Sequence, residues 1–526
     1  MTTQTTTTAE QALLQIERLV QFADQQQMIQ RADIDYARNA LLDLFKFDEP
    51  YEGEVPTEQL TSPVEVLEGL LDYGFEIGLI PEETLTYRDL LDAKIMGLLL
   101  PRPSELIAIF NKLAQEKGIS AATDMFYKLS IDSNYIRMDR IAKNPSWLHA
   151  TNYGDLQITV NLSKPEKDPK EIALLKTLPS AKYPKCLLCA ENVNYAGRVN
   201  HPARQNLRTI PIVLQNEQWH IQYSPYVYYN EHSIVFKGVH EPMVVSHSSM
   251  ARLLDFVEQY PHYFIGSNAD LPIVGGSILS HDHFQAGKHV FPMETAPIES
   301  SFTSEQYPSV KLGTVQWPMS VIRLQSSSKE EVKQLAASIL DQWKAYSDVS
   351  VDIYAFTEEE DGKLTPHNTI TPIARLLDNG NFELDLVLRN NRTSKQYPDG
   401  IFHPHQHLHH IKKENIGLIE VMGLAVLPGR LKAELSQIAD LLSNNDAAAI
   451  QATADATHPL HNHSHWIVEL AEQHGTSLSV QEANTLVQSQ TGGKFLEVLH
   501  DAGVYKRTEA GQTAFKAFIE SLGFQQ

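Results

Sequence analysis

Gly275-Gly276-Ser277-Ile278-Leu279-Ser280-His281-Asp282-His283-Phe284-Gln285 is the stretch that decides the fold. If residues 281 to 285 are extended, both histidines and the glutamine point to one face, because side chains alternate along a strand. Neutral imidazole is a competent nucleophile toward phosphorus, and the glycine pair lets a phosphate approach backbone N–H groups. We therefore predict a nucleotidyl-transfer site with His283 as the nucleophile. A structural metal site, or two core histidines, is the alternative for the segment taken alone.

The only two cysteines of the chain form the pair Cys186-Leu-Leu-Cys189. This spacing is typical of half a zinc site or of a redox dithiol, and two buried cysteines without chemistry are a third reading. The surrounding residues do not resemble the strand-to-helix turn of a thioredoxin-like unit. Zinc needs two further ligands, and His240 and His281 are the candidates because both follow β-type runs.

A second histidine-rich string runs from Phe402 to His410 and contains His403, His405 and three further histidines. Alone, it fits a metal site and a solvated loop equally well. The following run, Lys412 to Gly423, supplies two cations, glycines and Glu420, which together suit a sugar-phosphate pocket. A paired structural carboxylate is the alternative for Glu420.

The texture of the sequence divides the chain into three regions. Residues 1 to about 175 space apolar residues at the helical period, as in Ala9–Ile29, Val64–Gly78, Tyr87–Leu99 and Ser104–Lys117, and carry no recognisable chemistry. From 176 to about 410, short β-type runs alternate with two helical stretches, and each of two blocks ends near a His-x-His cluster. Helix-forming sequence returns after Pro428. These patterns predict an α+β fold with an antiparallel sheet and a duplicated half-domain.

Charge and composition exclude several classes of protein. The 526 residues carry 43 Lys+Arg against 65 Asp+Glu, a formal net charge of -22, which argues against a nucleic-acid partner. No apolar run is long enough for a membrane helix, and the polar N-terminus shows no secretion signal, so we expect a cytoplasmic enzyme. The basic residues that do occur near the histidine- and glycine-rich motifs favour phosphate recognition; they are Arg198, Arg204, Arg208, Lys288, Arg389 and Arg392.

The strings around His283 and from Phe402 to Arg430 resemble the class II bacterial branch of the galactose-1-phosphate uridylyltransferase family, in the histidine-triad superfamily. The resemblance covers about residues 175 to 435. It implies that His283 becomes uridylylated and that Gln285 steadies the phosphoryl group. It also implies that Cys186, Cys189, His240 and His281 hold zinc, and that a second metal lies near His403 and His405.

Four segments result: the helical patterns predict a helical domain over 1–175 and a helical region over 436–526, and the resemblance implies half-domains over 176–310 and 311–435. The substrates it implies are UDP-glucose and galactose 1-phosphate, and the assembly is a homodimer. The substrate-binding residues it implies are Arg204, Arg208, Asn268, Ser277, Lys413 and Glu420. Asp282 and Phe284 depart from the better-known branch, which has proline and a small residue there.

Two alternatives stay open at this point. A sister enzyme of the superfamily would use His283 on another nucleotide, or with water as the acceptor. A metal-binding protein would use the cysteines and the 403–410 histidines only to sequester metal, but this reading leaves the His283–Gln285 spacing unexplained.

Overall fold

The computed structural model describes residues 7–162, 182–276 and 278–526. These residues fall into two compact units. Unit 1 comprises Met1–Ala142, Pro165–Val227 and Glu231–Glu241, and unit 2 comprises Lys143–Lys164, Tyr228–Asn230 and Pro242–Gln526. Each unit is described by itself.

Unit 1 begins with a run of helices, in agreement with the helical period of its sequence. The capping box of Thr8 and Gln11 starts the first helix, whose buried stripe includes Ile16, Leu19 and Phe22. The helices are α1 (Ala9–Gln25), α2 (Ile34–Phe45), α3 (Val64–Glu76), α4 (Leu85–Gly97), α5 (Pro103–Lys117), α6 (Ile119–Asp132) and α7 (Met138–Ile141), with a short turn η1 (Arg31–Asp33). The four predicted helical segments are thus confirmed as α1, α3, α4 and α5.

The rest of unit 1 is an antiparallel meander of strands β3 (Ile210–Leu214), β4 (Glu217–Tyr223) and β5 (Ser233–Lys237). The meander packs on the helices: the Tyr223 hydroxyl donates to the Thr123 carbonyl of α6 at 3.0 Å, and its ring lies against Phe126. A short turn η2 (Ala190–Asn192) precedes the meander.

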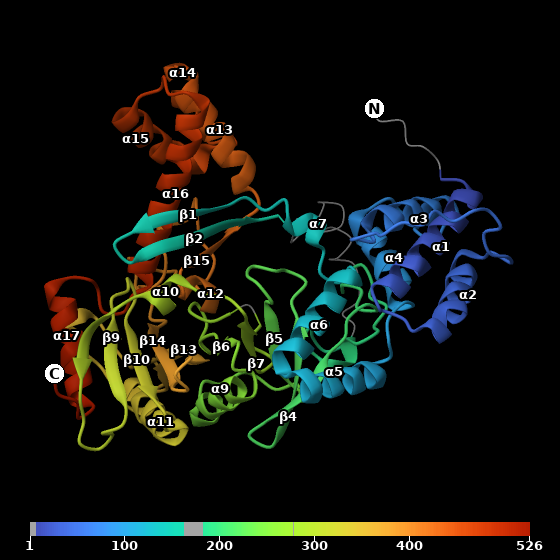
Figure 1. Cartoon of the computed structure of the whole chain (residues 1–526). Helices are drawn as coiled ribbons and strands as arrows, with labels where there is room; N and C mark the ends of the chain where they lie inside the picture. Colours follow the sequence, from blue (N-terminus) through green and yellow to red (C-terminus); the bar gives the residue numbers. More distant parts are fainter. Residues whose placement is uncertain (1–6, 163–181, 277) are drawn as a thin grey trace. The chain divides into compact units, whose positions relative to one another are not determined.

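Unit 2 holds the remaining sheet and the C-terminal helices (Figure 1). Its strands are β1 (Ser146–Thr151), β2 (Gly154–Asn161), β6 (Phe264–Gly266), β7 (His283–Gly287), β8 (Ile298–Phe302), β9 (Lys311–Val315), β10 (Val321–Ser326), β11 (Phe356–Glu358), β12 (Leu364–Pro366), β13 (Asn368–Leu376), β14 (Phe382–Asn390) and β15 (Leu424–Pro428). Its helices are α9 (His247–Gln259), α10 (Pro292–Thr295), α11 (Lys329–Ala345), α12 (Leu418–Val421), α13 (Leu431–Ser443), α14 (Ala447–Ala452), α15 (Ser464–His474), α16 (Val480–Ala502) and α17 (Glu509–Ser521), with short turns η3 (Val349–Val351), η4 (Gln406–Leu408) and η5 (His461–His463).

Within unit 2 the strands of the large antiparallel sheet follow the order β7-β6-β13-β14-β10-β9-β8. Helices α9 and α11 pack against one face of it (Figure 1). The opposite face carries Val321, Ile373 and Val387 into a core with Trp317, Leu418 and the C-terminal helices. Because both faces are covered, every residue of β14 is buried.

The sheet contains an internal repeat. In sequence, β4-β5-α9-β6-β7 is followed by β9-β10-α11-β13-β14, the same order of strands and helix. The third strands of the two series, β6 and β13, pair antiparallel, with Gly266 opposite Ile373. This arrangement confirms the α+β fold of two half-domains with an antiparallel sheet, preceded and followed by helices.

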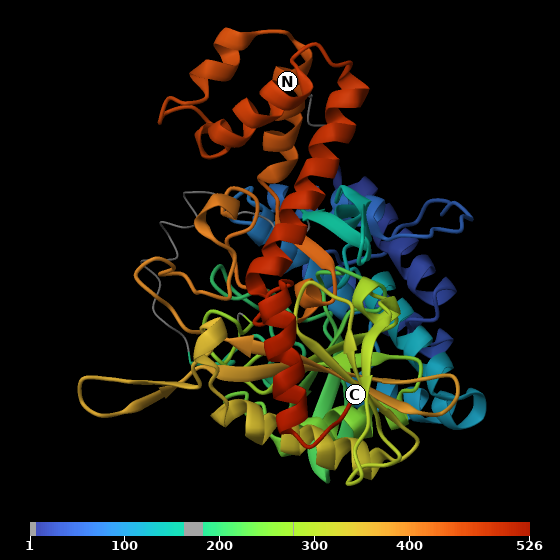
Figure 2. The same cartoon turned by 90° about the vertical axis from the view of Figure 1, so that its left-hand side faces the viewer.

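A separate three-stranded sheet, β1-β2-β15, contains a parallel pair, because β15 runs alongside β2. Figure 2 shows α16 running from the α13–α15 helices down toward the large sheet. Among the described residues, no helix is long and apolar enough to cross a membrane.

Three expectations from the sequence need correction or remain open. Val349–Phe356 is one of the β-type runs of the sequence for which a strand was predicted, and this prediction is wrong: the stretch holds the turn η3, and only its last residue enters β11. The helical run ends at Ile141, and β1 and β2 follow it, although residues up to 175 were expected to be helical. The boundary at 175 itself lies outside the described residues, and the four-segment division stays a prediction.

Candidate active site

His283 is the first residue of β7, and its side chain is held by the backbone just before the strand. Its Nδ1 lies 2.8 Å from the carbonyl oxygen of His281. A carbonyl oxygen can only accept, so Nδ1 carries the proton and Nε2 keeps its lone pair. Burial lowers the pKa of His283 to about 4, which agrees with a neutral ring. The imidazole is therefore set up with Nε2 as its nucleophilic atom.

Gln285 lies two residues further along β7, on the face that His283 occupies. Its amide oxygen Oε1 is buried and has no hydrogen-bond partner in the described part of the chain. A buried amide left partly unsatisfied is a group that a ligand can complete. The two predicted catalytic residues are thus neighbours on one strand.

Asp282 points to the other face, toward α9. Its carboxylate lies 3.6 Å from the guanidinium of Arg252, and both side chains are buried. Phe284 is buried on the same side by the alternation of the strand. Of the two departures from the better-known motif, Asp282 thus ties the start of β7 to α9 through an ion pair, and Phe284 is a buried core residue.

Asn268 follows β6 and lies on the face of His283. Gly266 pairs with Gln285, and the same register continued by two residues sets Asn268 opposite His283. The Oδ1 atom of Asn268 accepts from the backbone N–H of Leu418 at 2.8 Å, so its amino group is the part available to a phosphoryl oxygen.

Two glycines close around Asn268. A Cβ atom on Gly276 would lie 2.7 Å from the Asn268 Nδ2 atom, and one on Gly417 would lie 3.0 Å from its Oδ1. The backbone of Gly275 is held in addition by Asn415, whose Nδ2 donates to the Gly275 carbonyl at 3.1 Å. Gly276 and Gly417 therefore serve close approach to Asn268. Ser277, predicted as a substrate contact, lies outside the described residues.

Glu420 is a paired carboxylate. It accepts from the Lys412 ammonium at 2.9 Å and from the Gly417 N–H at 3.2 Å, so it caps α12. The structure thus brings Lys412 to Glu420, whereas Lys413, which was predicted with Glu420 as a substrate-binding residue, is exposed and lines an open pocket. Whether Glu420 and Lys413 contact the substrate stays a prediction.

Arg389 lies beneath the Glu420 segment, on β14. Its Nη2 atom donates to the Ile416 carbonyl at 2.9 Å, and within the described residues it forms no ion pair with a carboxylate, although it is fully buried. Burial lowers its pKa to about 10, while Glu420 acts in the opposite direction. Its contact fixes the loop that supplies the N–H groups facing Asn268.

Three of the four predicted metal ligands lie together in unit 1. The sulfur atoms of Cys186 and Cys189 are 3.6 Å apart, and the Cys189 Sγ is 3.3 Å from the His240 Nδ1. Asn192 donates to the carbonyls of both cysteines at 2.8 Å, and its Oδ1 is 2.7 Å from the His201 Nε2. Hydrogen bonds from Asn192 therefore hold the turn that carries the two cysteines, as neighbouring polar groups do around the ligands of protein metal sites.

The fourth ligand, His281, belongs to unit 2. Cys186, Cys189, His240 and His281 together form a group that could hold a metal ion. Two sulfur and two imidazole donors suit tetrahedral Zn²⁺. Burial raises the pKa of the Cys189 thiol to about 11, so a bound cation would have to favour the thiolate.

Arg204 and Arg208 lie in unit 1 and are both buried. Arg208 is committed to the backbone: its Nε donates to the Pro101 carbonyl at 2.8 Å, and its Nη1 donates to the carbonyls of Gln205 and Leu207. Arg204 lies over the Tyr135 ring at 5.6 Å, and its Nε has no hydrogen-bond partner among the described residues. Of the two, Arg204 keeps more capacity for a phosphate, and both roles stay predictions.

The predicted second metal near His403 and His405 finds no support among the described residues, where the group around Cys186 is the one that could hold a metal. His403 directs Nδ1 to the Pro404 carbonyl, and His405 directs Nε2 to the Ile401 carbonyl and Nδ1 to Asp501. These histidines lie in the loop after β14, not on the strand that repeats β7.

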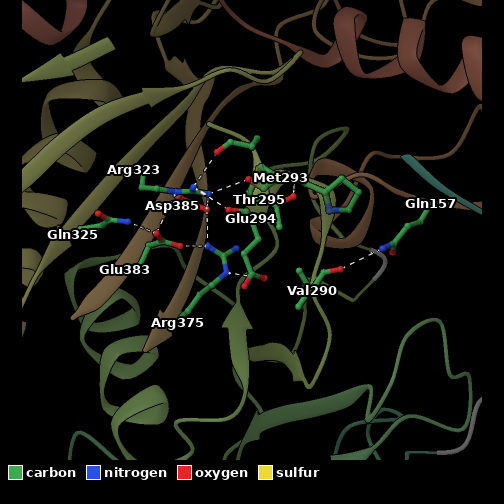
Figure 3. A network of polar contacts seen from close by, with 12 residues as sticks. Gln157, Val290, Met293, Glu294, Thr295, Arg323, Gln325, Arg375, Glu383 and Asp385 are labelled. Carbon is green, nitrogen blue, oxygen red and sulfur yellow. Dashed lines mark hydrogen bonds and ion pairs between the residues drawn. The ribbon is translucent and has the colours of Figure 1, made fainter. Parts of the chain in front are cut away.

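The strand that repeats β7 is β14. At the centre of the sheet, Gly266 of β6 pairs with Ile373 of β13. On its other side Gly266 pairs with Gln285 of β7, and Ile373 pairs with Asp385 of β14, so Gln285 and Asp385 occupy corresponding positions. Glu383 then holds the place of His283, and Arg375 holds the place of Asn268. Figure 3 shows that these positions carry an ion network of Arg323, Arg375, Glu383, Asp385 and Glu294. The second half-domain thus repeats the fold and replaces the nucleophile by salt bridges.

The residues that the sequence analysis did not select are Arg252, Lys412, Asn415, Arg323 and Arg375. Arg252, Arg323, Arg375 and Asn415 contact residues of other elements or loops, which the sequence does not reveal. Lys412 stands next to Lys413, which was predicted in its place. The charge of Asp282 in a run of buried residues was the signal that could have pointed to Arg252.

Comparison with known proteins identifies the family of the chain. A family profile described as galactose-1-phosphate uridyl transferase, N-terminal domain, matches residues 27–242, and the C-terminal domain profile matches residues 256–466. The chain is 58% identical over 519 residues to the galactose-1-phosphate uridylyltransferase of Caldanaerobacter subterraneus subsp. tengcongensis, covering 99% of both chains. It is 53% identical to the enzyme of that name from Halalkalibacterium halodurans, over 97% of this chain and 98% of the relative, and 49% identical to that of Bacillus subtilis, over 97% of each.

A solved structure of yeast Ap4A phosphorylase Apa2 is also similar, with a TM-score of 0.28 and 11% identity over 57% of this chain and 88% of that one. This likeness is too slight to bear on the fold. The sequence matches decide the class: the chain is an enzyme, a transferase. It belongs to the galactose-1-phosphate uridylyltransferase family.

Proposed function

We propose that this chain moves a uridylyl group from UDP-glucose to galactose 1-phosphate through a covalent intermediate on His283. The observation that carries the proposal is the hydrogen bond from His283 Nδ1 to the His281 carbonyl, in a chain of this family. That bond leaves Nε2 as the atom able to attack phosphorus.

In the first step, Nε2 of His283 attacks the α-phosphorus of UDP-glucose. A P–N bond forms, the P–O bond to glucose 1-phosphate breaks, and the electron pair leaves with that oxygen. In the second step, a phosphate oxygen of galactose 1-phosphate attacks the same phosphorus, the P–N bond breaks, and UDP-galactose leaves. The imidazole is then neutral again, as the ping-pong scheme of galactose catabolism requires.

The residues around His283 supply the surroundings for this reaction. The Nε2 amino group of Gln285, the Asn268 amino group and nearby backbone N–H groups would donate to the phosphoryl oxygens as charge builds on them. Asp282 and Arg252 hold the strand that carries the nucleophile. Preorganised donors of this kind are the largest single contribution in many transfer enzymes.

Intact-protein mass spectrometry tests the proposal directly. After incubation with UDP-glucose, the wild-type chain should gain the mass of one UMP, and peptide mapping should locate it on His283. His283→Ala should neither gain the adduct nor transfer, whereas His474→Ala, at an exposed position on α15, should do both. An adduct on another residue, or transfer by His283→Ala, would overturn the assignment.

The same experiment separates the rival enzymes of the superfamily. Offering ATP or a dinucleoside polyphosphate in place of UDP-glucose should give no adduct. Labelling by AMP, or release of UMP to water without a sugar phosphate, would favour an adenylyltransferase or a hydrolase. Metal binding without any adduct would favour the metal-binding alternative.

We propose further that Cys186, Cys189, His240 and His281 hold a structural Zn²⁺. The support is the donor chemistry of the set and the close contacts of the three ligands in unit 1. The ion would fix His281, whose carbonyl orients His283. Elemental analysis of purified Cys189→Ser and His474→Ala should show zinc lost in the first and kept in the second; equal zinc in both would refute the site. The homodimer expected from the resemblance also stays a prediction, which light scattering can measure.

A further inference from the structure

A cavity of about 600 Å³ opens in unit 2 between the loop after β14 and the helices α15 and α16. None of the residues around His283 lines it. Its walls are unusually rich in groups that recognise anions: Gln406, His407, His409, His410, Lys413, Asn462, His465, Trp466, Glu469 and Lys494. In a chain with a formal net charge of -22, two lysines and four histidines in one cavity, with one carboxylate, form a local positive patch.

One of these histidines, His410, is held by a relay of side chains. His410 Nδ1 lies 2.8 Å from His463 Nδ1, and His463 Nε2 lies 2.9 Å from the Glu434 carboxylate. Glu434 also pairs with Arg430, and an Arg430 N–H donates to the His410 carbonyl. His463 is buried, so the relay is built into the wall of the cavity.

The relay determines which nitrogen of His410 carries a proton. The ionised Glu434 can only accept, so Nε2 of His463 donates to it, and Nδ1 of the neutral ring is left to accept. His410 must therefore donate through Nδ1, and its Nε2 keeps a lone pair. Burial, and next the charge of His463, Lys494 and other cationic neighbours, lower the pKa of His410 to about 3, in agreement with a neutral ring.

The cavity thus combines cationic donors with one fixed acceptor. Lys413 forms no ion pair within the described residues, and Lys494 pairs with Glu497 at the edge of the cavity. The Nε1 of Trp466, which is buried in the wall, has no hydrogen-bond partner in the described part of the chain. A ligand that satisfies this set must be an anion, and must also bring an O–H group for His410.

We propose that this cavity binds a phosphate-type anion that carries an O–H group, with Lys413 and Lys494 as its cationic partners and His410 Nε2 as the acceptor. Monohydrogen phosphate and a phosphate ester with free hydroxyls share this chemistry. Sulfate has the same shape and charge but no proton at neutral pH, so it leaves the His410 lone pair without a donor and is disfavoured. The proposal is independent of the role of His283.

Isothermal titration of the full chain with inorganic phosphate, glycerol 3-phosphate and sulfate tests the proposal. Phosphate or glycerol phosphate should bind about tenfold more tightly than sulfate, since a hydrogen bond that sulfate cannot donate to the half-buried His410 is worth about that factor in affinity. Phosphate binding alone identifies the inorganic ion as the ligand, and tighter binding of glycerol phosphate identifies an ester. Equal affinity for sulfate would overturn the role of His410.

Variants then locate the binding. Lys494→Met should weaken phosphate binding about tenfold or more, and His465→Ala should weaken it by a smaller factor. Lys516→Met on α17, outside the cavity, should leave phosphate binding unchanged. His410→Phe should remove the preference for phosphate over sulfate. Circular dichroism and thermal unfolding check that each variant folds. Because His465 is exposed, His465→Ala still tests the site if Lys494→Met does not fold. Unchanged binding in folded Lys494→Met and His465→Ala would refute the site.

Discussion

The Nδ1 atom of His283 lies 2.8 Å from the carbonyl oxygen of His281, two residues earlier in the chain. The two histidines of the motif therefore act on one another through the backbone. The side chain of His281 belongs to the group that could hold a metal, while its carbonyl selects the tautomer of His283. A metal ion that restrains His281 would in this way also restrain the nucleophile, without touching it.

Replacement of Gln285 should affect chemistry more than binding. We expect Gln285→Ala to lower kcat by about 10²–10³-fold, the usual effect of losing one preorganised donor to a phosphoryl or carbonyl oxygen. The Michaelis constants for UDP-glucose and galactose 1-phosphate should change less. Steady-state kinetics measure both quantities, and a large rise in the Michaelis constants at unchanged kcat would place Gln285 in ground-state binding instead.

The close approach at Asn268 makes a second prediction. A Cβ atom on Gly276 would lie 2.7 Å from the Asn268 Nδ2, so Gly276→Ala should displace the Asn268 amide and lower kcat/KM. Gly493 on α16 is the matched control, because a Cβ atom there meets nothing within 4 Å. Gly493→Ala should keep full activity and raise stability by about 0.5–1 kcal/mol, as alanine does in helices. Steady-state kinetics and thermal unfolding of both variants test this prediction. Equal activities of the two variants would contradict a role for the close contact between Gly276 and Asn268.

The ion network of the second half-domain predicts a stability effect. Burial alone would raise the pKa of Asp385, yet Arg323 and Arg375 together hold it below its usual value. Asp385→Asn leaves both buried guanidinium groups without their shared carboxylate and should destabilise the fold by about 3–5 kcal/mol. Asp361→Asn, at an exposed position, should change little. Denaturant unfolding compares the two, and a small effect of Asp385→Asn would mean that Glu383 and Glu294 suffice.

Local patterns in the sequence were enough for four helices of unit 1 and for the extended segment that carries His283 and Gln285. Helical spacing is set by near neighbours, and the alternation of His283 and Gln285 lies within the single strand β7. The parallel pair of β2 and β15 was not predictable in this way, because the two strands are remote in sequence. Strand formation here depends on the pairing itself and not on a local pattern.

The choice between adjacent residues was also beyond the sequence. Lys412 and Lys413 have the same chemistry, and only the path of the loop after η4 brings Lys412 to Glu420 and leaves Lys413 in the open cavity. His403 and His405 were predicted as the counterpart of His281 and His283 because both pairs share the His-x-His spacing. Strand pairing, which no local pattern encodes, shows that Glu383 and Asp385 hold that place.

The pH dependence of folding follows from His232, a buried residue of unit 1. Its Nδ1 lies 2.8 Å from the Tyr226 carbonyl, and burial lowers its pKa to about 4 although that hydrogen bond opposes the shift. Between about pH 6.5 and about pH 4 the unfolded chain therefore binds one proton more than the folded chain, so stability falls as the pH falls through this window. The slope from one such proton is at most about 1.4 kcal/mol per pH unit.

His232→Asn tests this origin, because an asparagine amide can replace the Nδ1 donor to Tyr226 but does not titrate. Unfolding of the variant should depend less steeply on pH in the same window, by up to one proton. Other buried histidines, such as His201, act in both proteins and cancel in the comparison. His474→Asn, an exposed control, should keep the wild-type slope. Parallel curves for His232→Asn and wild type would mean that His232 keeps an ordinary pKa in the folded chain.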